Sequence, residues 1–353
     1  MYTAIYTILV ALGLSVRRSN ESSWLLALMA FFLWFMGARY FVGCDFTGYY
    51  SRFEGISIEA NLESALNFHE PGFQLLMTAI RLMDLDYMWM NVAASAIILA
   101  GYYVFLRGLP NPLMIFALLF PVMIVQLSMS GIRQGIAVAL LLVGATYFLR
   151  GQRVWTAIWI ALAAQFHTSA AMFIPIAFLA GQRVSFIRLV IGVVALTPVA
   201  VYLMSERLEV YSDRYIVQIY GEMSSGGALF RYLLILIPAI LFAVYYEKMR
   251  EKFPRQYELL KLFTLITFAL LPVYFLSSVA LHRLTFYVMP FSIVSFVYVS
   301  SIIFPRSQQL VGQVMPALAY GVYFVAWQTL SGHADQCYTP YQNYLFIGSD
   351  ALF

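Results

Sequence analysis

The chain has 353 residues, of which 62% are hydrophobic and 11% are charged, with a mean hydropathy of +0.79 and a formal net charge of +4. Because about a quarter of the residues in a soluble domain are charged, this composition excludes a soluble protein and indicates a polytopic membrane protein. The apolar segments are apolar throughout, which also excludes a transmembrane barrel with its alternating polar and apolar residues.

The apolar segments predict an all-α fold with about twelve transmembrane helices, since a helix that crosses a bilayer needs about 20 apolar residues. They lie at about 2–16, 22–42, 87–106, 112–128, 131–149, 154–166, 168–180, 189–204, 229–247, 258–280, 284–304 and 310–330. The first segment lacks a basic N-terminal region and a small-residue cleavage motif, so we expect it to be a retained span. No polar block is long enough for a second domain, and residues 1–353 are expected to form a single integral membrane domain.

Two longer polar segments lie between the predicted spans. In 43–86, the run from Phe73 to Met83 is too short to cross a bilayer, and Pro71 before it suits a first helical turn, so we expect a short re-entrant or interfacial helix. The segment 205–228 mixes charged and aromatic residues, which predicts an amphipathic helix at the membrane interface or, alternatively, a mobile lid.

The distribution of Lys and Arg among the loops predicts the orientation of the chain in the membrane. The most basic loop is Glu247–Lys261, which the positive-inside rule places on the cytoplasmic side. Counting spans from it places 43–86, 205–228, both termini and every histidine on the opposite face. Polar groups that converge on one face of a membrane protein favour a functional site there.

Arg133 is the only residue between Pro112 and Leu149 that is charged at neutral pH, and this stretch is long enough for two spans joined by a turn. It is either a functional group at the membrane face or an arginine that merely extends to the interface.

His167 lies between two spans of only 13 residues each. Since each would reach about 20 Å into a core of roughly 30 Å, His167 is expected on the wall of a vestibule, unless a neighbouring helix carbonyl accepts its hydrogen bond.

Arginines and possible bases suggest the chemistry of this face. Arg39, Arg133 and Arg283 each lie at the outer end of a predicted span, and their guanidinium groups could hold a lipid pyrophosphate or, in a transporter, a small anion. Further candidates for substrate binding are Tyr49, Gln134, Arg214 and His282.

A base could be supplied by Glu70, His167 or Asp45, in that order of preference, to take a proton from a sugar hydroxyl. The alternative is that Asp45 pairs with Arg39 and Glu70 with Arg81, so that both carboxylates only brace the outer loop.

Other motif signals are weak, such as the DxD at Asp84-Leu85-Asp86, or absent. The sequence contains no Walker motif, Rossmann fingerprint, Cys/His metal spacing or nucleic-acid signature, so we expect no cofactor, no metal and no nucleic-acid partner. Cys44 and Cys337 share the outer face and could form a bridge in an oxidising compartment, but two free thiols are expected.

Several short motifs together resemble the EpsG family, which includes Wzy-type polymerases of bacterial exopolysaccharide and O-antigen. They are Arg39-Tyr40 with Gly43 and Asp45, Glu70-Pro71-Gly72-Phe73, Ile132-Arg133-Gln134-Gly135-Ile136-Ala137, Phe166-His167-Thr168-Ser169, Arg283-Leu284 with Tyr287, and Pro340-Tyr341. The family's usual proline after the histidine is Thr168 here, which puts the geometry of that turn in doubt.

The resemblance implies a glycosyltransferase of the bacterial inner membrane whose active site faces the periplasm. It would transfer a growing glycan from undecaprenyl pyrophosphate onto another lipid-linked repeat unit, without a nucleotide sugar or a metal. Its partners would be the lipid-linked donor and acceptor, the bilayer and a chain-length regulator. The alternatives are an O-antigen ligase that delivers glycan to lipid A-core and, outside the enzymes, a flippase or transporter of the lipid-linked glycan.

Overall fold

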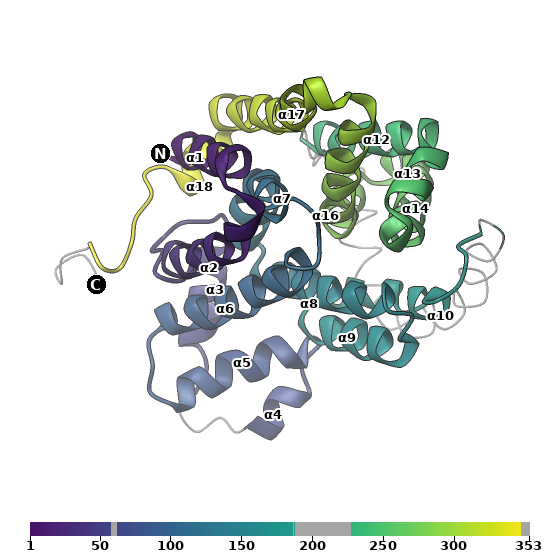
Figure 1. Ribbon diagram of the computed structural model, residues 1–353. Coiled ribbons are helices and arrows are strands. Elements are labelled where there is room, and N and C mark those ends of the chain that lie inside the picture. Colours follow the sequence, from purple (N-terminus) through teal and green to yellow (C-terminus); the bar gives the residue numbers. More distant parts are fainter. Residues whose placement is uncertain (58–61, 186, 188–226, 347–353) are drawn as a thin grey trace. The chain divides into compact units, whose positions relative to one another are not determined.

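The computed structural model describes residues 1–57, 62–185, 187 and 227–346 (Figure 1). These residues form helices joined by turns, and the one extended pairing among them is an isolated bridge between Arg39 and Asn343. The predicted all-α fold is therefore confirmed. The chain divides into two compact units, one made of 1–147, 154–171 and 317–353 and the other of 148–153 and 172–316. A single integral membrane domain stays a prediction.

Four helical segments in the described part of the chain are long and apolar enough to cross a membrane. They are α6 (Tyr87–Leu106), α14 with α15 (Pro254–Phe275), α16 (Ser278–Ile303) and α17 (Gln309–Leu330). A fifth results if α12 (Ala228–Val244) and α13 (Tyr246–Lys252), which meet at 83°, form one broken span. The expected twelve spans are thus not confirmed, and the segments 189–204 and 205–226 lie outside the described residues.

The first unit is built around packed helices from both ends of the chain. Its helices, wholly or mostly within the unit, are α1 (Tyr2–Ser15), α2 (Glu21–Gly37), α3 (Phe46–Glu54), α4 (Leu62–Leu66), α5 (Pro71–Leu82), α6, α7 (Pro112–Leu119), α8 (Ile132–Phe148), α9 (Arg153–Phe166), α17 and α18 (Gly332–Tyr338). Helix α2 packs on α6, and α1 packs on α7. Small residues allow close approach: a Cβ added at Gly101 of α6 would lie 2.6 Å from the carbonyl oxygen of Ala139 in α8.

A π-helix at Phe120–Ser128 continues α7, and a short turn separates it from α8. Pro121 lies at the start of this π-helix and cannot donate a backbone hydrogen bond. Wide helical turns of this type are frequent near functional sites. The two predicted segments joined by a turn just before Arg133 are confirmed as helices.

The polar segment 43–86 contains α3, α4 and α5. Helix α5 begins at Pro71, as predicted, and buries Phe73, Met77 and Ile80 on one face. It packs against α4, α3 and α6. The N-terminal end of α5 is thereby held beside α3, which is the feature that positions the candidate site.

Within its described residues, the second unit contains α10 (Ile176–Leu179), α12, α13, α14 (Pro254–Ala269), α15 (Leu271–Leu276) and α16. Helices α12 and α14 both pack on α16, and the stacked rings of Phe263 and Phe291 have centroids 3.6 Å apart. The predicted span at 168–180 is helical but is not confirmed as one continuous helix. It is divided into a 3-10 helix at Thr168–Phe173 and the short α10, with Pro175 between them removing a backbone donor.

Candidate active site

Arg39 lies at the end of α2 in a closed environment. Its side chain is 1% exposed and donates hydrogen bonds to the backbone carbonyls of Met36 and Val42. Four tyrosine side chains lie near it: Tyr2, Tyr87, Tyr338 and Tyr341. The guanidinium group is thus enclosed by backbone carbonyls and rings, and it has different partners from those of Arg133.

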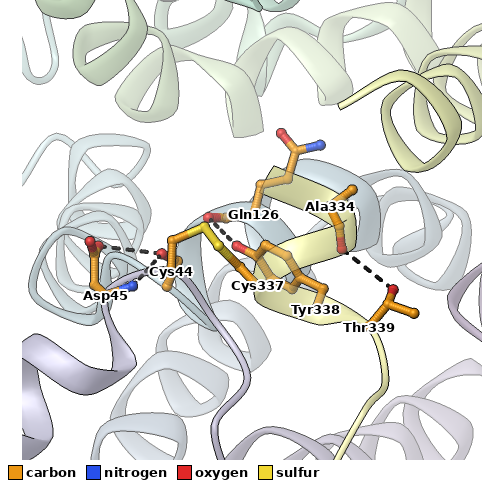
Figure 2. The surroundings of a disulfide bond; sticks show 8 residues. Cys44, Asp45, Gln126, Ala334, Cys337, Tyr338 and Thr339 are labelled. Carbon is orange, nitrogen blue, oxygen red and sulfur yellow. Dashed lines mark hydrogen bonds between the residues drawn. A yellow bond between two sulfur atoms is a disulfide. The ribbon is translucent and has the colours of Figure 1, made fainter. Parts of the chain in front are cut away.

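A disulfide bond joins Cys44, in the loop after α2, to Cys337 in α18 (Figure 2). The expectation of two free thiols is therefore wrong. The Cα atoms lie 4.9 Å apart although 293 residues separate the two cysteines, a proximity that sequence spacing cannot indicate. The backbone N–H of Gly43 also donates to the carbonyl of Cys337 at 2.7 Å. The segment after α17 is thereby fixed to the loop between α2 and α3.

The same loop packs on the turn that precedes α8. A Cβ added at Gly43, whose φ is +105°, would lie 1.9 Å from the carbonyl oxygen of Met129, so only glycine permits this approach. The next contact is mutual: the Asp45 backbone N–H donates to Ser130 Oγ, and Ser130 Oγ donates to Asp45 Oδ2, each at 3.3 Å. Asp45 thus fixes the turn that leads into Arg133.

Arg133 lies in the first turn of α8 and joins two other elements. Its Nη1 donates to Glu70 Oε2 in an ion pair at the N-terminal end of α5. Its Nε donates to the hydroxyl of Tyr49 in α3 at 3.3 Å, and the Tyr49 ring lies under the guanidinium carbon at 5.8 Å. The Arg133 side chain is 36% exposed. A guanidinium oriented by two partners and still partly accessible can bind an anion.

Glu70 also contacts His167, which follows the last residue of α9. Its Oε1 lies 2.8 Å from His167 Nδ1 and also accepts from the backbone N–H of Thr168 at 3.4 Å. A carboxylate that accepts from Nδ1–H leaves Nε2 as the ring nitrogen that can take a proton. Both oxygens of the buried Glu70 are thus engaged by donors.

The pKa of Glu70 reflects these contacts. Burial raises the pKa, but the hydrogen bond from His167, the charge of Arg133 and the hydrogen bond from Arg133 outweigh burial and lower it to about 2. Glu70 therefore stays a carboxylate at neutral pH. It is suited to orienting His167 and Arg133 rather than to taking a proton itself.

The alternative pairing, in which the carboxylates only brace the outer loop, is not what the structure shows. Glu70 pairs with Arg133 and His167, whereas Arg81 pairs with Glu54 at 3.5 Å. The carboxylate at the N-terminal end of α5 thus joins the two functional candidates that lie 63 and 97 residues further along the chain.

The EpsG family matches residues 23–343, which are most of the chain and include Glu70, Arg133 and His167. The chain belongs to the EpsG family. The resemblance inferred from the short motifs is thereby confirmed, and the protein is a membrane protein of the polysaccharide-polymerase-like type. Neither a curated protein nor a solved structure matches the chain.

The other predicted site residues of this EpsG-family protein do not take part in the contacts described above for Glu70, or they lie outside the described residues. Gln134 is buried next to Arg133 in α8. His282 and Arg283 lie near the start of α16 in the second unit, where His282 Nε2 lies 3.4 Å from Arg231 Nη1. Arg214 is outside the described residues. The predicted clamp of Arg133 with Arg39 and Arg283 stays a prediction.

Within the described residues, one group of three side chains of metal-ligating type is found. A nitrogen of His333 and the sulfur atoms of Cys44 and Cys337 all lie within 4.8 Å of one another. The two sulfur atoms are bonded to each other, so they are not the thiolates that a metal requires. In the oxidised state shown here, these side chains do not form a metal site.

Arg52 was missed by the sequence analysis. Its Nη2 donates to Gln74 Oε1 at 3.1 Å, which connects α3 to the first turns of α5. The signal was its spacing, because Arg52 follows Tyr49 by three residues and so lies on the same face of α3. Without knowledge that α3 faces α5, that spacing indicated nothing.

Proposed function

We propose that this EpsG-family protein is a glycosyltransferase that polymerises oligosaccharide repeat units carried on undecaprenyl pyrophosphate. It would act at the bacterial inner membrane, with its site open to the periplasm. Family membership supports the general class. The observation that carries the specific proposal is the contact of Glu70 with both His167 and Arg133, because it combines an oriented base with a cation for a leaving phosphate.

His167 is the proposed base. Its Nε2 takes the proton from a hydroxyl of the acceptor sugar, and that oxygen attacks the anomeric carbon of the donor glycan. The bond between the anomeric carbon and the phosphate oxygen breaks, and its electron pair leaves with the lipid pyrophosphate. Arg133 stabilises the negative charge on this leaving group through its accessible N–H donors. Glu70 is a positioning residue that holds His167 in the reactive tautomer.

Asp45 has a supporting role in this proposal. Its carboxylate accepts from Ser130, three residues before Arg133, and so fixes the turn from which Arg133 projects. The order of preference for the base inferred from the sequence, with Glu70 first, is thus changed to His167, because both oxygens of Glu70 already accept hydrogen bonds.

The test is a reaction of the purified protein in nanodiscs with lipid-linked repeat units as the only glycan. We expect a ladder of products from the wild type. His167→Ala should lower the initial rate about 100-fold or more, the usual contribution of a positioned base. The matched control is His333→Ala, an exposed histidine of the same unit, which should leave the ladder unchanged. A parallel reaction with a chelator tests whether a divalent metal is needed.

Three results would contradict the proposal. A His167→Ala variant that is folded and makes normal ladders would exclude His167 as the base. Product formed only after lipid A-core is added would indicate a ligase. Movement of labelled lipid across the bilayer with no ladder would indicate a transporter.

A further inference from the structure

A second guanidinium group lies beside the Glu70–Arg133 pair. Arg52 and Tyr49 are three residues apart on α3 and project from one face of it. Tyr49 accepts from Arg133, while Arg52 donates to Gln74, which lies one helical turn after Glu70 and is only 5% exposed. Two residues on one face of α3 are therefore connected to the N-terminal end of α5. Tyr49 is connected through Arg133, and Arg52 is connected through its own bond to Gln74.

The two arginines are close enough to affect each other electrostatically. Burial and then the positive charge of Arg133 lower the pKa of Arg52, while the negative charge of Glu70 raises it. Glu70 is already engaged on both oxygens, by Arg133 and by His167. One carboxylate thus faces two guanidinium groups, and the positive charge that it leaves uncompensated favours an anion.

Both guanidinium groups are also held by aromatic rings. The Arg52 guanidinium carbon lies 5.8 Å from the centroid of Phe68, and that of Arg133 lies 5.8 Å from the centroid of Tyr49. A planar guanidinium stacked on a ring loses less freedom when it binds a phosphate through its N–H donors. A guanidinium has five such donors, and the bond from Arg52 to Gln74 uses one.

We propose that Arg52 and Arg133 form a diphosphate-binding site in which each guanidinium binds one of the two linked phosphate groups. The proposal rests on the proposed function and adds Arg52 as a binding residue. Arg52 then supplies a second cation beside Arg133, whereas the sequence predicted Arg39 and Arg283 in that role. The chemistry that recognises the ligand is a diphosphate, whether free or attached to a lipid.

The experiment measures binding by calorimetry to the purified full-length protein in detergent, with inorganic pyrophosphate and a long-chain prenyl diphosphate as separate ligands. Arg52→Gln keeps an amide that can bond to Gln74 but removes the charge, and we expect its Kd to rise about tenfold, equal to about 1.4 kcal/mol. Arg52→Lys should recover part of the affinity. The matched control is Arg81→Gln, which removes a cation that also connects α5 to α3 through Glu54 and should bind as the wild type does.

The outcomes separate this inference from the proposed function. Unchanged affinity in a folded Arg52→Gln variant, alongside weaker binding by Arg133→Gln, would overturn the two-arginine site while the polymerase proposal stands. Loss of diphosphate binding in Arg52→Gln, with no polymer from the wild type, would overturn the polymerase proposal and retain the two-arginine site.

The two ligands identify the source of the diphosphate. If only the prenyl diphosphate binds in an Arg52-dependent way, the ligand is a lipid. If only inorganic pyrophosphate binds in that way, the ligand is a free anion. Thermal unfolding of each variant shows whether it is folded, and Arg52→Lys replaces Arg52→Gln if the latter is not.

Discussion

At the scale of single residues, the site depends on how one carboxylate is shared. Glu70 is buried, and an isolated buried carboxylate would be costly. It accepts from Arg133 on one oxygen and from His167 and the Thr168 backbone on the other. The sequence identified Glu70, His167 and Arg133 as candidates because polar groups converge on one predicted face of the membrane. Their roles needed the geometry, since a carboxylate whose oxygens both accept hydrogen bonds is a poor base.

A pH-dependent stability difference is expected at Glu70. Since the pKa in the folded protein, about 2, lies below the ordinary value of 4.5, the charged carboxylate stabilises the folded state fully above about pH 4.5. That contribution is lost as the pH falls toward 2. Glu70→Gln should therefore lower the melting temperature at neutral pH, and the difference from wild type should shrink below pH 4.5.

Thermal unfolding at several pH values measures this difference. The control is Glu54→Gln, since Glu54 forms a more exposed pair with Arg81, and exposed pairs contribute little to stability. A difference at Glu70 that grows toward pH 3 would show that the carboxylate is not held charged by Arg133 and His167.

At the scale of elements, the two ends of the first unit meet at the loop that leads into the site. The disulfide fixes α18 to the loop after α2, Tyr344 N–H donates to the carbonyl of Ala38 at 2.8 Å, and the hydroxyl of Tyr2 donates to the carbonyl of Tyr338 at 3.1 Å. Figure 1 shows α1, α2 and α18 close together. The loop in turn packs on the turn before α8, so these contacts support the position of Arg133.

Loss of the disulfide should therefore affect both stability and activity. Closing a loop of nearly 300 residues restricts the unfolded chain, and this entropic contribution is about 6 kcal/mol in the loop-closure description. We expect the double variant Cys44→Ser with Cys337→Ser to melt at a lower temperature and to polymerise more slowly. A reducing agent should lower the activity of the wild type but not that of the double variant. Equal melting temperatures of wild type and variant under oxidising conditions would contradict this expectation.

Sequence patterns predicted the helices better than the contacts between them. The ends of α6, of the segment 112–128 and of α5 follow from apolar run length and from a proline at the first helical position, which are local properties. The disulfide, the enclosure of Arg39 by tyrosines and the contact between α3 and α5 depend on which elements are neighbours. No local pattern encodes that information, and so Arg52 was missed and Cys44 was expected to be a free thiol.

At the scale of the whole molecule, charge and redox chemistry favour the same orientation. The basic stretch around α13 and the start of α14 predicts a cytoplasmic position. A disulfide is typical of an oxidising compartment, which predicts that Cys44, Cys337 and the neighbouring site face the periplasm. The two arguments are independent, because one counts Lys and Arg while the other rests on a bond between distant cysteines.

A labelling experiment tests this orientation. Both cysteines of the chain are in the disulfide, so one added cysteine provides a single reactive thiol. Thr47→Cys, exposed in α3 near the site, should react with a membrane-impermeant maleimide in spheroplasts. Arg255→Cys, exposed near the start of α14, should react only after permeabilisation. Both variants should react fully in detergent, which serves as the control. Protection of Thr47→Cys with labelling of Arg255→Cys would reverse the orientation, and the site would then face a compartment in which its disulfide would not be expected to persist.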